Sequence, residues 1–67
     1  MPPEHLINNM WRLFEGESVS GEGGTIEGPK MVRVHELEGG KLMIQAGSEK
    51  VMVEGTDFKA VVQKKTG

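Results

Sequence analysis

Sixty-seven residues are enough for one domain, and a chain of this length buries only about 60% of the surface that it exposes when unfolded. The chain has no cysteine, which excludes disulfides and thiolate metal sites as supports for a small core and leaves self-association as the remaining common one. A net charge of −2 and a pI of about 5.6 differ from the strongly basic character of dedicated nucleic-acid-binding domains.

The charges are unevenly distributed. Residues 1–29 carry five glutamates against Arg12 alone, whereas residues 30–67 carry seven lysines and arginines against five acidic residues. Such a division can steer partners or set one half of a chain against the other. No apolar run is long enough for a membrane span, and the first residues lack the features of a secretory signal. We therefore expect a soluble, cytoplasmic protein that does not contact a membrane.

Residues 3–15 are predicted to form an amphipathic helix. Pro2 and Pro3 suit a first helical turn, and Gly16 suits the position after a helix end. The apolar residues fall on one side of a helical projection: Leu6, Ile7, Met10, Trp11, Leu13 and Phe14. We expect this stripe to cover the apolar face of a sheet. Docking to a partner or to a sister subunit is the alternative.

The next segment, residues 16–29, is rich in Gly and Glu. It is predicted to form a loop or an edge hairpin, the latter pairing residues 18–20 with residues 25–27.

Residues 31–63 are predicted to form an antiparallel meander with strands at 31–37, 41–46, 49–54 and 57–63. A three-residue loop at 38–40 would set Val34 opposite Ile44. Two-residue turns at Gly47-Ser48 and Gly55-Thr56 each place Gly where a type II′ turn needs a positive φ. The tail, residues 64–67, has nothing to bury and is expected to fray.

Because side chains alternate along a strand, these turns determine which residues share a face. One face is apolar and is expected to form the core: Leu42, Ile44, Ala46, Val51, Val53, Phe58, Ala60 and Val62. The opposite face is mixed and basic.

These elements together predict an α+β fold, in which the N-terminal helix packs on an antiparallel meander of four to five short strands. A hairpin within residues 16–29 could close the sheet toward a small barrel. In outline, a short helix followed by a bent meander resembles small Sm-like and SH3-like barrels. This resemblance concerns architecture and assigns no functional residue.

Groups suited to catalysis are few. Without cysteine, a nucleophile would be a Ser or a Thr, and only His5 and His35 could act as imidazole bases. His35-Glu36 begins like a zinc-protease helix motif, but the second His is missing and the segment is predicted as strand. We therefore predict no catalytic residues, no metal site and no cofactor, and expect a protein that is not an enzyme.

The mixed face of the meander is the predicted binding face for a protein or an anion. It comprises Arg33, His35, Met43, Gln45, Lys50, Met52 and Lys59. Methionine adapts its shape and is common at binding surfaces. We hypothesise a non-enzymatic binding or assembly module that acts as a homo-oligomer or with a protein partner.

The alternative is a nucleic-acid-binding regulator that uses the cations of this face and the terminal Lys64-Lys65. Single-strand binding also needs aromatic side chains for stacking. Trp11, Phe14 and Phe58 are all expected in the core, which argues against this alternative.

Overall fold

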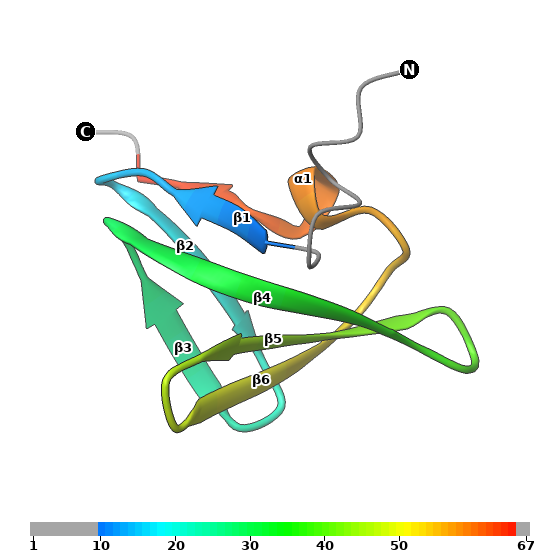
Figure 1. The fold of residues 1–67 in the computed structure, drawn as a ribbon. Helices are drawn as coiled ribbons and strands as arrows, with labels where there is room; N and C mark the ends of the chain where they lie inside the picture. The colour runs from blue at the N-terminus through cyan, green and yellow to red at the C-terminus, as the bar shows by residue number, and fades with distance from the viewer. Residues whose placement is uncertain (1–9, 66–67) are drawn as a thin grey trace, which may run out of the picture.

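A computed structural model describes residues 10–65 of the chain. These residues form seven strands and one helical turn: β1 (Met10–Leu13), β2 (Glu17–Gly21), β3 (Gly24–Glu27), β4 (Lys30–Leu37), β5 (Lys41–Ala46), β6 (Glu49–Glu54), α1 (Phe58–Val61) and β7 (Gln63–Lys64). The strands make two antiparallel sheets, with the orders β1-β4-β5-β6 and β3-β2-β7 (Figure 1). No helix within residues 10–65 is long and apolar enough to cross a membrane.

The β4-β5-β6 meander has the register that its loops predict. Val34 lies opposite Ile44 across the loop at residues 38–40, and Ile44 lies opposite Val51 across the turn at Gly47. Gly47 has a φ of 61°, a conformation that side-chain-bearing residues rarely adopt. The prediction of the meander and of these two registers is confirmed.

Residues 16–29 are predicted to form either a loop or an edge hairpin, and the structure contains the hairpin, β2-β3. Val19 pairs with Ile26, and both are buried. On the outer side of the same strands, the Ser20 and Thr25 hydroxyl oxygens lie 2.9 Å apart, within hydrogen-bond distance. Two aliphatic anchors therefore hold a hairpin whose exposed side is polar.

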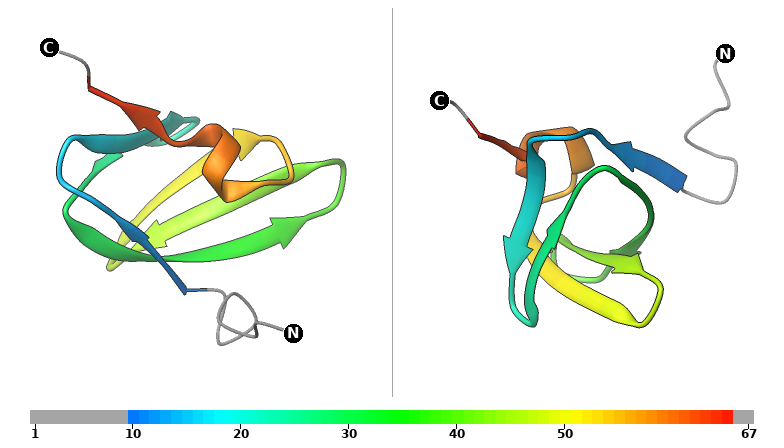
Figure 2. Two further views of the ribbon diagram at one scale, coloured as in Figure 1. Left: turned by 90° about the horizontal axis from the view of Figure 1, so that it is seen from above. Right: turned by 90° about the vertical axis from the view of Figure 1, so that its left-hand side faces the viewer.

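The two sheets enclose one apolar core. Ten hydrophobic side chains are buried: Leu13, Val19, Ile26, Val32, Val34, Leu42, Ile44, Val51, Val53 and Phe58. Within residues 10–65 no polar or charged residue is buried. Two further views show the strands curving around this shared interior (Figure 2).

A single backbone pair joins β2 to β6. Glu22 and Met52 each donate an amide hydrogen bond to the other's carbonyl oxygen, at 2.8 and 2.9 Å. A side chain at the neighbouring Gly21 would clash with the Met52 carbonyl and lie 2.7 Å from the Val53 Cγ1 atom. Glycine at position 21 therefore allows the two sheets to approach closely enough to pair.

The prediction of an α+β fold with a helix over residues 3–15 is wrong, because the described residues form a nearly all-β domain. Met10–Leu13 is strand β1, which pairs with β4 through Trp11 opposite Val32. Residues 3–9 of the predicted helix lie outside the described residues. Leu13 is buried and Arg12 is exposed, so this short segment also satisfies the period of a strand.

The strand predicted over residues 57–63 is also wrong. Gly55-Thr56 does not open a hairpin, and Asp57 instead caps α1 by accepting a hydrogen bond from the Lys59 amide at 3.1 Å. This helical turn buries Phe58 and leaves Ala60 exposed. The predicted antiparallel pairing of residues 57–63 with β6 across Gly55-Thr56 therefore does not occur.

The start of the tail is held, although residues 64–67 were expected to fray. Lys64 lies in β7 opposite Glu17, and the Lys65 amide donates to the Gly16 carbonyl at 2.7 Å. Lys64 and Lys65 have backbone partners because the edge of β2 and the adjacent Gly16 are free to pair with them.

Candidate binding surfaces

Six of the seven residues of the predicted binding face lie together on the outer side of the β1-β4-β5-β6 sheet. They form two cross-strand rows, Arg33-Gln45-Lys50 and His35-Met43-Met52. The His35 Nε2 and Gln45 Oε1 atoms lie 3.3 Å apart and link the two rows. The register of the meander therefore brings these side chains together as the sequence predicted.

Strand β1 and the start of β4 enlarge this surface. Met10 lies opposite Arg33 in the β1-β4 pair. Met31 precedes Arg33 by two residues in β4, so both side chains point outward. Sequence reasoning missed both residues. The alternation of β4 could have revealed Met31, whereas Met10 required knowing that β1 is a strand.

We call this surface the methionine face, and it consists of Met10, Met31, Arg33, His35, Met43, Gln45, Lys50 and Met52. Four of the five methionines of the chain lie on it. Met31 is 45% exposed and Met52 is 38% exposed, while Met10 and Met43 are half-buried. The face thus combines an adaptable apolar centre with the cations Arg33 and Lys50.

Lys59 is the exception, and its assignment to this face is wrong. It lies on α1, where its Nζ atom is 5.6 Å from the centroid of the Trp11 ring. The cause is the replacement of the predicted hairpin by a helical turn, so that Lys59 does not continue the strand alternation of the meander.

The outer side of the second sheet has a different chemistry. Strand pairing places Ser18, Ser20, Thr25 and Glu27 there, and Glu22 continues it next to Met52. We call these five residues the hydroxyl-acid face. It carries hydroxyl groups and two carboxylates where the methionine face carries cations and thioethers.

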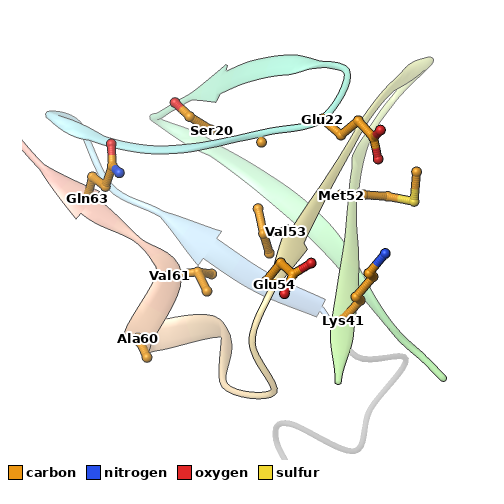
Figure 3. A pocket seen from close by; sticks show the side chains of 10 residues that line it. Ser20, Glu22, Lys41, Met52, Val53, Glu54, Ala60, Val61 and Gln63 are labelled. Atoms are coloured by element: carbon orange, nitrogen blue, oxygen red, sulfur yellow. The ribbon is translucent and has the colours of Figure 1, made fainter. Parts of the chain in front are cut away.

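A hollow of about 660 Å³ opens between the end of β2, β6 and the α1-β7 segment (Figure 3). Glu22, Glu54 and Lys41 lie around it, and Val53 and Val61 form apolar parts of its wall. The residues that line it include no histidine, so it lacks the pairing of a hydroxyl nucleophile with an imidazole base. In the part of the chain that the structure describes, no three acidic or imidazole side chains gather as metal ligands would.

A second cleft, of about 340 Å³, lies between β1 and the α1-β7 segment. We call it the aromatic cleft, and the residues that line it are Trp11, Arg12, Phe14, Glu17, Phe58, Lys59, Val62 and Lys64. The Trp11 and Phe58 rings stack with centroids 5.3 Å apart and planes inclined by 30°. The three aromatic residues of the described chain, Trp11, Phe14 and Phe58, all line this cleft.

The prediction that all three aromatic residues lie in the core is correct only for Phe58. Trp11 is half-buried, and Phe14 is 59% exposed. In β1 the inward positions are Trp11 and Leu13, so the extended backbone directs Arg12 outward, and Phe14 follows the strand with its side chain exposed. A helix over the same residues would have placed Phe14 on the apolar stripe, which is why the sequence did not reveal the cleft.

In comparisons with known proteins, no family model, no curated protein and no solved structure matches this chain.

Proposed function

We propose that this protein is a non-enzymatic assembly module in which the methionine face of one copy binds the hydroxyl-acid face of the next. The observation that carries this proposal is the presence, on one small domain, of two outer sheet faces with complementary chemistry.

The methionine face has the composition of a contact surface. Flexible thioether side chains can adapt to a partner surface, and burying them would remove apolar area from water. Met31 and Met52 are among the most exposed large apolar side chains of residues 10–65. Placing these side chains against a partner is favourable because water then no longer contacts them.

Charge complementarity favours a second copy of this chain as the partner of the methionine face. Arg33 and Lys50 are exposed on the methionine face, whereas Glu22 and Glu27 are exposed on the hydroxyl-acid face. Two methionine faces brought together would oppose like charges. A head-to-tail contact instead pairs opposite charges, and repetition of such a contact gives a ring or an open chain of subunits.

The size of the core provides a reason for assembly. Only ten hydrophobic side chains are buried in residues 10–65. A domain of this size is marginally stable alone, and association is one of the usual additional sources of stability.

Analytical ultracentrifugation over a wide range of protein concentrations tests the proposal. The wild-type protein should associate, and Met43→Glu and Arg33→Glu should each weaken association while circular dichroism shows the fold retained. Lys59→Glu is the matched control, since Lys59 lies off the methionine face, and it should associate like the wild type.

Two results would overturn the proposal. A wild-type protein that is monomeric at every concentration would exclude assembly. Association that Arg33→Glu abolishes but Glu27→Lys leaves unchanged would mean that the hydroxyl-acid face is not the partner of the methionine face.

A further inference from the structure

The aromatic cleft presents an exposed ring surface. Phe14 is 59% exposed, the highest value among the large apolar side chains of residues 10–65. The Arg12 Cζ atom lies 6.0 Å from the centroid of the Phe14 ring, so a guanidinium group accompanies the ring. An aromatic face exposed next to a cation is suited to stacking with a flat, anionic ligand.

The charges around the cleft are mainly positive. Arg12, Lys59 and Lys64 line it together with one acidic residue, Glu17. The Glu17 Oε1 atom accepts a hydrogen bond from the Phe14 amide at 2.8 Å, so this carboxylate is engaged in the turn after β1. With the Glu17 carboxylate included, the three cations still leave a net charge of +2 on the side chains that line the cleft.

The positive surface continues beyond Phe14. Arg12 and Phe14 also line a neighbouring hollow of about 280 Å³, whose wall includes Lys30 and Met31. Lys30 Nζ lies 4.0 Å from an oxygen of Glu49, and both side chains are exposed, so a phosphate could compete for this lysine. The two hollows share Phe14, with Lys59 and Lys64 in one and Lys30 in the other. This arrangement suits an extended anionic chain.

We propose that the aromatic cleft binds single-stranded nucleic acid, with a base stacked on Phe14 and backbone phosphates held by Arg12, Lys59 and Lys64. Every base has a flat face that can stack on an aromatic ring, so the contact does not depend on sequence. An acidic peptide would satisfy the cations but leave the ring exposed, and a duplex keeps its bases stacked on each other. The cleft itself shares no residue with the methionine face or the hydroxyl-acid face as defined above, but it adjoins the methionine face, because Arg12 lies opposite Met31 in the β1-β4 pair.

Trp11 provides the measurement, because it is the only tryptophan of the chain and lines the cleft. Titration with an unlabelled oligothymidine of about ten nucleotides should change its fluorescence, ten nucleotides being within the range of site sizes for small single-strand-binding domains. Three phosphate contacts predict a slope of about −2 when the logarithm of the binding constant is plotted against that of the salt concentration.

Variants separate stacking from charge. Phe14→Ala should weaken binding about tenfold or more, and Phe14→Tyr should keep most of it because the ring remains. Lys64→Ala should weaken binding less and make the salt slope shallower by about 0.7. Lys50→Ala is the matched control on the methionine face and should bind like the wild type. Met43→Glu should also retain binding, which distinguishes a failure of this proposal from a failure of assembly.

Several results would overturn the inference. These are an unchanged fluorescence at low salt, equal affinity for the matching duplex, equal affinity for polyglutamate, and a loss of affinity in Lys50→Ala as large as in Phe14→Ala.

Discussion

Val51 and Met52 are neighbours in β6 and have opposite surroundings. Val51 is 2% exposed within the core, whereas Met52 is 38% exposed on the methionine face. Val51→Asp would bury a carboxylate among apolar side chains and should cost several kcal/mol, comparable with the whole stability of a small domain. Met52→Lys should change stability by no more than about 0.5 kcal/mol.

Urea unfolding at low protein concentration measures both changes without a contribution from association. If Met52→Lys unfolded the domain and Val51→Asp did not, the two faces of the meander would be reversed.

The element whose stability depends most clearly on one side chain is α1. It is a single helical turn, and its N-cap Asp57 accepts the hydrogen bond from the Lys59 amide. Asp57→Ala should cost about 1 kcal/mol, whereas Asp57→Asn should keep most of the stability because its side chain can accept the same hydrogen bond. Thermal or urea unfolding of the two variants measures the difference.

The same cap also supports the aromatic cleft. Phe58 stacks on Trp11 from the first position of α1. Asp57→Ala should therefore alter the fluorescence of Trp11, and a variant with unchanged stability and unchanged fluorescence would show that the cap does not hold this turn.

The junction at Glu22 and Met52 joins the two sheets into one unit. The amides of Glu22 and Met52 are both hydrogen-bonded across it. We expect these amides to exchange with deuterium only when the sheets separate, and therefore far more slowly than the amide of Ser48 in an exposed turn. Hydrogen exchange followed by NMR measures this. Exchange at Glu22 as fast as at Ser48 would mean that the sheets open independently.

Local patterns in the sequence predict the β4-β5-β6 meander and the grouping of six of the seven residues of the predicted binding face, and they offer the β2-β3 hairpin as one of two alternatives. A turn glycine with a positive φ sets the register of β5 and β6, and a three-residue loop sets that of β4 and β5. Strand period then places Arg33, Gln45 and Lys50 in one row. These are local rules, so they act without information from distant parts of the chain.

The conformation of the two ends of the described chain depends on packing against distant residues. Residues 10–13 fit a helix or a strand equally well by their apolar spacing, and the free edge of β4 selects the strand. Residues 58–61 become helical because Asp57 caps them and the core accepts Phe58. The aromatic cleft lies where these two segments meet, and so no local pattern revealed it. Short segments have weak intrinsic preferences, and the surfaces that they pack against determine their structure.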